Sequence, residues 1–306
     1  MSTLIPINSI DLQKDLDDSG LDLLLDKLFF DKGYDFRGYK KTSIRRRIKR
    51  RMHLNNISAY EKYMELLDSS PVEYQRLFDD LTIRVTGFFR DIYPFYVIRS
   101  RIIPDIINNN SHNPPLVPPL PRGDTEGLKG DEEGLNNEIR IWCPGCATGE
   151  EPYSIGMLLS DVLKDDIAKF NIKIFGTDIN ETALESARLG IYDSSAFKEM
   201  KEEYKNRHFF LVGSKYRIKY SVRQLVRYGI HSLVRHTPIS HLDILLCRNV
   251  LIYFDRGLQE KALRDFYYAL KPNGYLILGK SEVIISEFRD VFKEIDREAR
   301  IYQKKG

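Results

Sequence analysis

A short loop near residue 145 carries the residue types of a cofactor site. It reads PGCATGEE (144–151) and follows the apolar run IRIWC (139–143). Gly145 and Gly149 allow sharp turns and a close approach to a ligand. The loop lacks both the GxGxxG spacing and the Lys-Ser/Thr pair of phosphate-binding loops. Glu150 and Glu151 would repel a pyrophosphate, so the loop disfavours NAD and favours S-adenosylmethionine, whose amino and sulfonium groups are positive. A plain strand-to-helix turn is the alternative.

Asp178 ends the next apolar run, KIFGTD (173–178). An acidic side chain at the end of a second strand accepts hydrogen bonds from ribose hydroxyls in this kind of fold. The alternative is a helix cap, because Asp178 and Asn180 precede ETALESA (181–187). The glycine loop one strand earlier favours the ribose role.

The cysteines predict neither a metal site nor a disulfide framework. Cys143 and Cys146 form a CxxC pair, and Cys247 stands alone. A structural zinc site needs about four ligands, and no second pair is present at a matching spacing. We therefore predict no metal and, by default, a cytoplasmic protein.

A basic segment near the N-terminus forms an amphipathic pattern, YKKTSIRRRIKRRMHL (39–54). On a helical wheel Ile44, Ile48 and Met52 make one stripe. The basic residues lie opposite it or beside it: Arg46, Lys49 and Arg50 opposite, Arg47 and Arg51 at its borders. A solvated face is the simplest interpretation and nucleic-acid binding a second. The net charge of the chain is only +3, which gives the second no further support.

Three regions follow from the pattern of the whole chain. Residues 1–107 show helical periodicity and predict a small all-α domain. Residues 108–137, rich in Asn, Pro and Gly, predict an extended linker. Residues 138–306 alternate apolar runs with helices, which predicts an α/β domain with a parallel sheet. In it, residues 209–228 predict a small antiparallel insert, and the runs 291–295 and 299–303 a closing hairpin.

Neither a signal peptide nor a membrane span is predicted, since no apolar run approaches the ~18 residues that a span needs.

Five motifs in order resemble one family, the chemotaxis-receptor glutamate methyltransferases (CheR). They are LTIRVTGFFRD (81–91), GCATGEEPYS (145–154), FGTDIN (175–180), CRNVLIYFD (247–255) and GYLILGKSE (274–282). The resemblance implies an N-terminal all-α helical domain, followed by a class I (Rossmann-like) methyltransferase domain with a small antiparallel β insert. It also implies transfer of a methyl group from S-adenosylmethionine, leaving S-adenosylhomocysteine, to glutamates on the cytoplasmic helices of chemoreceptors.

The resemblance also implies site residues. The expected cofactor-binding residues are Thr86, Arg90, Gly145, Glu150, Asp178, Ser232, Leu233, Arg248 and Asn249, of which Thr86 and Arg90 are expected to reach the cofactor from the helical domain. The expected catalytic residues are Arg90 and Tyr253, and the expected receptor-docking residues are Arg46, Arg47, Lys49 and Arg50. Two positions depart from the family, which commonly has Asn at Arg84 and at Ser232. These changes bear on cofactor affinity and do not predict loss of activity.

The implied reaction suits these residue types. A glutamate carboxylate has a pKa of ~4.3 and is ionised at neutral pH. It therefore needs no general base, only alignment and desolvation. Arginine and a tyrosine hydroxyl orient an oxyanion without removing a proton, which favours Arg90 and Tyr253. For Tyr253 a core aromatic is the alternative.

The expected partner is the acidic helical bundle of a chemoreceptor, with the enzyme as a monomer. Family members that bind a receptor C-terminal peptide carry an extended Gly-rich turn in the insert. Here the turn is only VGSK (212–215), which favours recognition without that tether. Two other functions stay open: methylation of nucleic acid, and sensing of S-adenosylmethionine without catalysis.

Overall fold

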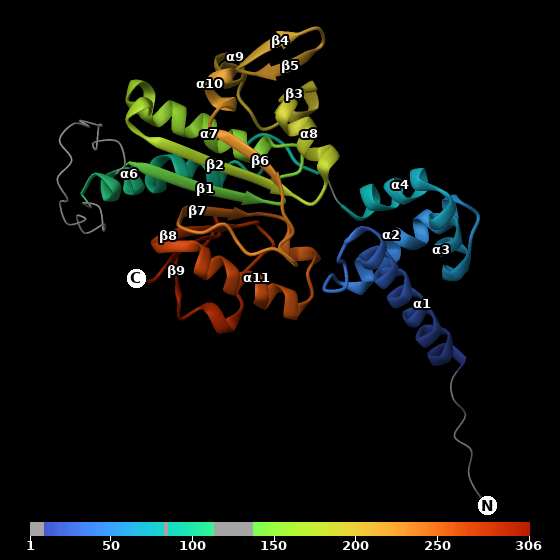
Figure 1. The fold of residues 1–306 in the computed structure, drawn as a ribbon. Coiled ribbons are helices and arrows are strands. Elements are labelled where there is room, and N and C mark those ends of the chain that lie inside the picture. Colours follow the sequence, from blue (N-terminus) through green and yellow to red (C-terminus); the bar gives the residue numbers. More distant parts are fainter. Residues whose placement is uncertain (1–8, 83–84, 113–136) are drawn as a thin grey trace, which may run out of the picture. The chain divides into compact units, whose positions relative to one another are not determined.

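The computed structural model describes residues 9–82, 85–112 and 137–306, which fall into two compact units (Figure 1). The first unit comprises Met1–Ile83 and Tyr253–Lys261, and the second comprises Arg84–Ile252 and Ala262–Gly306. Of the predicted linker, residues 108–112 are helical, and residues 113–136 lie outside the described part of the chain. No helix within the described residues is long and apolar enough to cross a membrane.

The first unit is helical, as predicted. Its helices are α1 (Ser9–Lys32), α2 (Lys41–Leu54), α3 (Tyr60–Ser69) and α4 (Pro71–Leu81). The predicted apolar stripe of Ile44, Ile48 and Met52 is buried in its core. Residues of α1 and α3 are buried there as well, including Leu21, Leu24, Leu28, Tyr63 and Leu67. Helix α4 begins with Pro71 at its first position, and the Ser70 hydroxyl accepts the backbone N–H of Glu73 at 3.2 Å.

An open sheet of seven strands forms the centre of the second unit, in the order β6-β2-β1-β7-β8-β10-β9 (Figure 1). The strands are β1 (Glu138–Pro144), β2 (Asn171–Asp178), β6 (Val226–Ile230), β7 (Leu242–Cys247), β8 (Leu270–Leu278), β9 (Phe292–Asp296) and β10 (Ile301–Lys304). The pairs from β6 to β8 are parallel, and β10 is antiparallel to both its neighbours. The predicted parallel sheet and its closing hairpin are therefore confirmed.

Helices separate the parallel strands. The helical elements that follow β1 are α7 (Glu150–Leu163), η3 (Lys164–Lys169), α8 (Glu181–Leu189), η4 (Ser194–Phe197), α9 (Glu202–His208), α10 (Tyr220–Arg223), η5 (Leu251–Tyr253), α11 (Arg256–Ala269) and η6 (Ser286–Phe288). Residues of η5 and α11 also belong to the first unit. Strand β7 is buried along its whole length. Ile141 and Ile244 share one core cluster with Ile155 of α7, while the Trp142 ring meets Phe266 of α11 with centroids 6.3 Å apart. Because successive side chains of a strand point to opposite faces, the sheet is covered on both.

The helical run 93–112 belongs to the second unit, although the sequence analysis places residues 93–107 in the first domain and residues 108–112 in the linker. It consists of α5 (Tyr93–Val97), η1 (Ile98–Ile102) and α6 (Ile103–His112). Phe95, Ile98 and Ile102 lie in the same buried cluster as the strands of the sheet. Helical periodicity predicts the element correctly, but it does not reveal which core the apolar face meets.

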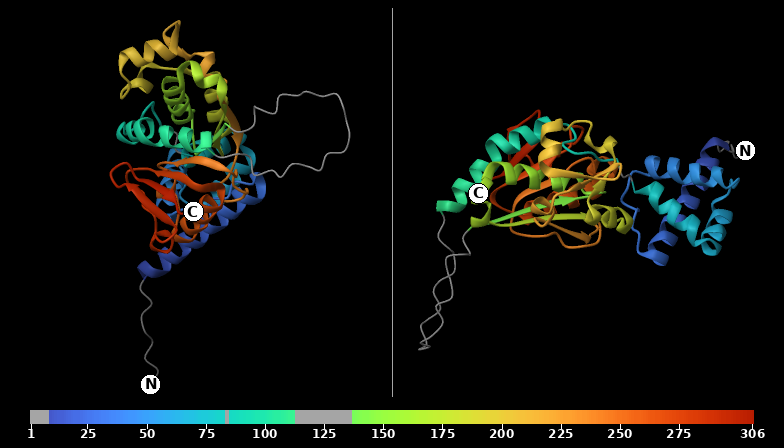
Figure 2. Two further views of the ribbon diagram at one scale, coloured as in Figure 1. Left: turned by 90° about the vertical axis from the view of Figure 1, so that its left-hand side faces the viewer. Right: turned by 90° about the horizontal axis from the view of Figure 1, so that it is seen from above.

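The insert is a separate three-stranded sheet, and only the first part of the predicted range 209–228 belongs to it, since the later residues form α10 and the start of β6. It contains β3 (Ile191–Tyr192), β4 (Phe209–Val212) and β5 (Lys215–Ile218), in the order β3-β5-β4. Val212 pairs with Lys215, so the turn has only two central residues, and Gly213 has φ +61° there. Figure 2 shows this insert, in yellow, far from the red C-terminal hairpin of the same unit.

Candidate active site

The candidate site lies at the carboxyl ends of β1 and β7, where the order of the strands in the sheet reverses direction. Strands β1 and β7 are neighbours, but β1 leads through α7 to β2 on one side and β7 leads through α11 to β8 on the other. Such switch points leave a crevice at the carboxyl ends of the strands, where ligands bind. The loops that follow β1, β2, β6, β7 and β8 therefore supply the candidate residues.

The loop after β1 has the sharp turns that its glycines predict. Gly145 has φ +70° and Gly149 has φ +93°. A Cβ atom on Gly149 would lie 2.6 Å from the Tyr228 hydroxyl oxygen and 2.8 Å from the Ala187 Cβ. Both the backbone angle and the space therefore require glycine at position 149.

Asp178 holds this loop against the end of β2. One carboxylate oxygen accepts the backbone N–H of Ala147 at 2.9 Å, and the other accepts that of Asn180 at 2.9 Å. Asn180 caps α8, because its side chain accepts the N–H of Ala183 at 3.0 Å. Asp178 is therefore not the helix cap. A carboxylate has about four acceptor positions, so the side chain retains capacity for hydroxyl donors.

Glu150, at the first position of α7, is a buried carboxylate. The residue is 5% exposed, and its carboxylate accepts a hydrogen bond from the Thr148 hydroxyl at 2.7 Å. Burial raises the pKa of Glu150 to about 7, which the Thr148 hydrogen bond partly opposes. Within the described part of the chain no cation pairs with it. A ligand ammonium group would compensate this charge, so the residue fits the amino group of S-adenosylmethionine.

Arg248 makes its described contacts with protein groups. Its guanidinium forms ion pairs with Asp91 at 3.0 Å and Glu151 at 3.3 Å, and it donates to the Arg90 carbonyl at 2.9 Å. Burial raises the pKa of Glu151 to about 7, and Arg248 acts in the opposite direction. Arg248 thus joins the loop after β7 to α7 and to the segment before α5.

Glu282 was not singled out from the sequence, yet it organises the loop after β7. The residue is 4% exposed, and its carboxylate accepts hydrogen bonds from the backbone N–H groups of Asn249 and Val250, each at 2.9 Å. It also accepts those of Ile252 at 3.2 Å and Gly279 at 2.6 Å. Burial raises its pKa, although the four backbone donors oppose the rise. Asn249 has φ +59°, so Glu282 holds a left-handed backbone in place.

Thr86 and Arg90 lie in the second unit. The family resemblance implies instead that they belong to the helical domain and reach the cofactor from there. The Phe88 N–H donates to the Ala196 carbonyl at 3.0 Å, and the Phe89 N–H donates to the Ser154 hydroxyl at 3.1 Å. These bonds fix the segment, and the Arg90 guanidinium donates to the Val85 carbonyl at 2.7 Å. Arg84 lies outside the described residues.

Ser232 and Leu233 follow β6 and reach the same edge of the sheet. The His231 N–H donates to the Asp178 carbonyl at 3.0 Å. Ser232 accepts the Val234 N–H on its hydroxyl at 3.3 Å and donates its own N–H to His236 Nδ1 at 3.1 Å. Both residues are half-buried. The structure thus brings this loop together with Asp178.

Tyr253 and the basic helix α2 belong to the first unit. Arg46, Lys49 and Arg50 are exposed, as the helical wheel predicts. Arg47 is half-buried and donates to the Asp80 carbonyl at 2.7 Å. Burial lowers the pKa of Arg47, and the nearby Tyr253 hydroxyl acts against that shift. Two residues assigned to the substrate thus lie close together.

The cysteine thiols are buried. Burial raises the pKa of Cys143, Cys146 and Cys247 well above the ordinary value, so all three are protonated at neutral pH. No group of three or more His, Cys, Asp and Glu side chains suited to a metal ion occurs among the described residues.

The sheet order and the strand-end site define a class I methyltransferase. Two family models match this chain: "CheR methyltransferase, all-alpha domain" over residues 19–82 and "CheR methyltransferase, SAM binding domain" over residues 128–301. The chain belongs to the CheR methyltransferase family, as its motifs predict. The expectation of a methyltransferase that uses S-adenosylmethionine is likewise confirmed.

Several proteins are similar along most of this chain. An uncharacterized 104.1 kDa protein of Rhodobacter capsulatus is 32% identical over 269 residues, which cover 88% of this chain and 26% of that protein. The chemotaxis protein methyltransferase Cher2 of Pseudomonas putida is 30% identical over 69% of this chain and 70% of its own length. The chemotaxis protein methyltransferase of Borreliella burgdorferi is 29% identical over 90% and 92%. The chain thus spans about a quarter of the Rhodobacter protein but most of the other two.

Proposed function

We propose that this protein transfers the methyl group of S-adenosylmethionine to glutamate side chains on the cytoplasmic helices of chemoreceptors. The observation that carries the proposal is Glu150, a buried carboxylate at the end of the glycine loop that pairs with no cation in the described part of the chain. The receptor target rests on the names of the relatives, two of which are chemotaxis protein methyltransferases.

In this proposal the cofactor residues act from several strand ends. Glu150 binds the amino group, and Asp178 accepts hydroxyl groups of the ribose while it holds the Ala147 backbone. Gly145 allows the left-handed turn of the loop, where a Cβ atom would lie 2.5 Å from Val250. Ser232, Leu233 and Asn249 supply further cofactor contacts at the ends of β6 and β7. Thr86 and Arg90 contribute from the segment before α5. Arg248 is a positioning residue, because its guanidinium is committed to Asp91 and Glu151.

The bound S-adenosylmethionine would supply an electrophilic methyl group on a sulfonium. The substrate carboxylate is already ionised, so the protein orients it and excludes water rather than removing a proton. We assign this orienting role to the Arg90 guanidinium, for which the described residues supply one hydrogen bond, to the Val85 carbonyl. The Tyr253 hydroxyl is the second donor, near Arg47.

The basic helix α2 is the proposed receptor-docking surface. Its residues Arg46, Lys49 and Arg50 project from the face opposite the buried stripe of Ile44, Ile48 and Met52. Arginine and lysine side chains there complement an acidic helical bundle and raise the rate of encounter. Arg47 borders the stripe and is assigned to the acceptor region.

The proposal also covers the mode of receptor recognition, the compartment and the oligomeric state. The two-residue turn between β4 and β5 supports recognition without a receptor C-terminal peptide, because it offers little extra backbone for strand addition. The protein is proposed to act in the cytoplasm as a monomer, without metal and without nucleic acid. A methyltransferase for RNA is the second candidate, favoured only by the exposed charge of α2.

The test is incubation of the protein and tritiated S-adenosylmethionine with chemoreceptor-containing membranes or, separately, with RNA. Glutamyl methyl esters release volatile methanol in mild base, so the proposal predicts base-labile label on receptors alone. Label on RNA would select the second candidate. Tight binding of S-adenosylmethionine without transfer to either would indicate a sensing module and end the proposal.

A further inference from the structure

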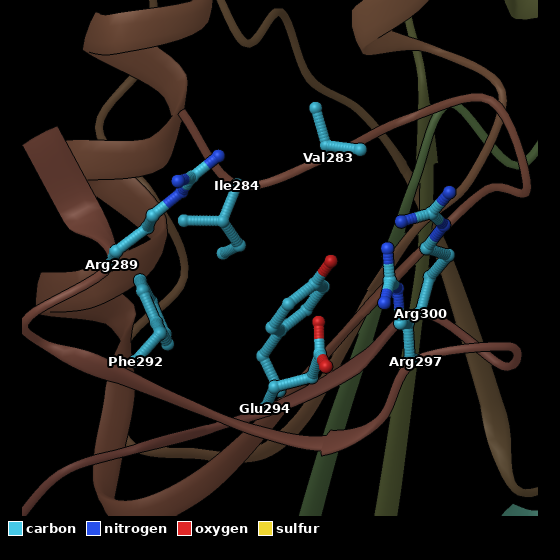
Figure 3. Close-up of a pocket in the computed structure, with 8 residues that line it drawn as sticks. Val283, Ile284, Arg289, Phe292, Glu294, Arg297 and Arg300 are labelled. Atoms are coloured by element: carbon cyan, nitrogen blue, oxygen red, sulfur yellow. The ribbon is translucent and has the colours of Figure 1, made fainter. Parts of the chain in front are cut away.

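A cavity of about 520 Å³ lies between the loop after β8 and the β9–β10 hairpin of the second unit (Figure 3). Its floor is apolar and aromatic, because Ile284, Phe292 and Tyr302 are all buried. Concave sites with an apolar floor and a few polar groups are typical of ligand binding. None of the residues discussed for the cofactor lines this cavity.

The rim is strongly basic. Arg289, Arg297 and Arg300 outnumber the single carboxylate of Glu294. Figure 3 shows Arg289 on one side, Arg297 and Arg300 on the opposite side, and Glu294 between them. Within the described residues none of these arginines forms an ion pair. Guanidinium groups bind planar oxyanions bidentately, so the rim suits an anionic ligand.

The position of Glu294 between the arginines favours a ligand with separated negative charges over one with a single dense charge. A ligand with dense charge at its centre, such as a polyphosphate, would place that charge near this carboxylate. A segment with separated carboxylates instead places one toward Arg289 and another toward Arg297 and Arg300. The aromatic floor accepts the methylene groups of glutamate or aspartate side chains. The rim therefore favours an acidic stretch of protein.

This cavity is joined to the active site by a short stretch of chain. Glu282, which binds the backbone of Asn249, is followed directly by Val283 and Ile284 of the cavity wall. On the opposite wall, the Arg300 carbonyl accepts the N–H of Leu278, the last residue of β8, at 3.1 Å. The cavity thus lies next to the carboxyl edge of the sheet.

We propose that this arginine pocket binds acidic side chains that flank the methyl-accepting glutamate of the protein substrate. The inference rests on the proposed function, because it requires an acidic protein as the acceptor. An acceptor carboxylate held at the strand ends leaves its neighbours within reach of a basic rim at the same edge. The pocket would then select acceptors that stand in acidic surroundings.

The test compares two double variants that remove the same charge. Arg289→Ala/Arg297→Ala changes the pocket, and Arg99→Ala/Arg264→Ala changes exposed positions of the same unit outside it. With a purified receptor cytoplasmic fragment, the pocket variant should raise KM about fivefold or more and leave kcat within about twofold. The control should leave both constants within that range, and both variants should bind S-adenosylmethionine like the wild type.

A charge-altered fragment makes the test specific. Glutamates that flank the acceptor are changed to glutamine while the acceptor is kept. If these side chains occupy the pocket, the altered fragment should raise the wild-type KM and remove the difference between wild type and pocket variant. Equal KM values for pocket variant and control on the unaltered fragment would overturn the inference.

A binding measurement separates this inference from the proposed function. Calorimetry with a fragment whose acceptor is glutamine needs no methyl transfer. If the wild type never methylates the receptor, the proposed function fails, but weaker binding by the pocket variant would still support the pocket. Loss of binding to single-stranded RNA, with receptor binding unchanged, would overturn an acidic protein as the occupant.

Discussion

The two groups of charged residues in this molecule behave in opposite ways. On α2 the side chains of Arg46, Lys49 and Arg50 are exposed to solvent. At the strand ends of the second unit, Glu150 and Glu282 are almost completely buried. Solvent and salt screen the first group, with a Debye length of ~10 Å at 0.1 M. Burial strengthens every interaction of the second group and raises its pKa values.

This difference indicates that the exposed and the buried charges have different functions. Screened charges act over a distance and change the rate of encounter with little demand on geometry. Buried charges act at contact and depend on each hydrogen bond that holds them. Substitutions at the strand ends should therefore change stability and cofactor binding strongly and show little salt dependence. Substitutions on α2 should change stability and cofactor binding little, and their effect on receptor methylation should depend strongly on salt.

The largest effect is expected at Glu282. Replacement with alanine leaves the N–H groups of Asn249, Val250, Ile252 and Gly279 without their acceptor. Glu282→Ala should lower the free energy of unfolding by roughly 3–5 kcal/mol, measured by urea denaturation. Glu282→Gln keeps one acceptor oxygen and should lose less. A loss below ~1 kcal/mol for the alanine variant would show that the loop does not depend on this carboxylate.

Replacement of Glu150 should raise the free energy of unfolding of the unbound protein, whereas replacement of Glu282 lowers it. Its pKa is about 7 in the folded state against an ordinary 4.5, so the folded state holds the proton more tightly. Its contribution to stability is therefore complete below pH 4.5 and is lost as the pH rises through 7. Glu150→Gln should then stabilise the unbound protein by on the order of 2–3 kcal/mol at pH 8, with no gain at pH 4.

The control for this prediction is Glu181→Gln. Glu181 occupies the same first helical position in α8 but is exposed. It should give no stabilisation at pH 8 in thermal denaturation. Equal melting temperatures for Glu150→Gln and wild type at pH 8 would contradict the buried charge. The same Glu150→Gln variant should bind S-adenosylmethionine more weakly, and wild-type affinity should fall as the pH drops below about 7.

Asp178 should affect the cofactor more than the fold. Asp178→Ala removes a ribose acceptor and releases the Ala147 and Asn180 backbone. Affinity for S-adenosylmethionine should fall by roughly 1.5–3 kcal/mol in calorimetry. Salt should change this loss little. Unchanged affinity in a folded variant would remove Asp178 from the cofactor site.

The smallest effect per charge is expected on α2. Each exposed charge contributes about 0.2–1 kcal/mol, so Arg46→Ala/Lys49→Ala/Arg50→Ala should slow receptor methylation several-fold at low salt. Raising the salt should bring the wild type toward the variant, while cofactor affinity stays the same. If the triple variant equals the wild type at low salt, α2 is only a solvated face.

The sequence predicts the fold well because apolar periodicity reports it directly. The apolar runs 139–143 and 173–178 became β1 and β2, the runs 291–295 and 299–303 overlap β9 and β10, and the buried stripe of α2 is the predicted one. The assignment of residues 93–107 to the first domain differs from the structure, because an amphipathic pattern does not reveal which surface it packs against.

The candidate site could be predicted only in part from the sequence. The turns at Gly145 and Gly149 and the exposure of α2 follow from residue type and spacing. The roles of Glu282 and Arg248 do not, since most of their partners are 30 to 158 positions away along the chain. The motif GYLILGKSE ends on Glu282, and an acidic residue shortly after a buried strand was the signal available.

The most direct measurement locates the transferred methyl group. Receptor fragment is incubated with the protein and S-adenosylmethionine bearing a trideuterated methyl group, then digested and analysed by mass spectrometry. We predict the label on glutamate side-chain carboxylates, with loss of label after mild base and greatly reduced label with Glu150→Gln at limiting S-adenosylmethionine. Label that resists base, or label on residues other than glutamate, would contradict a carboxylate methyltransferase.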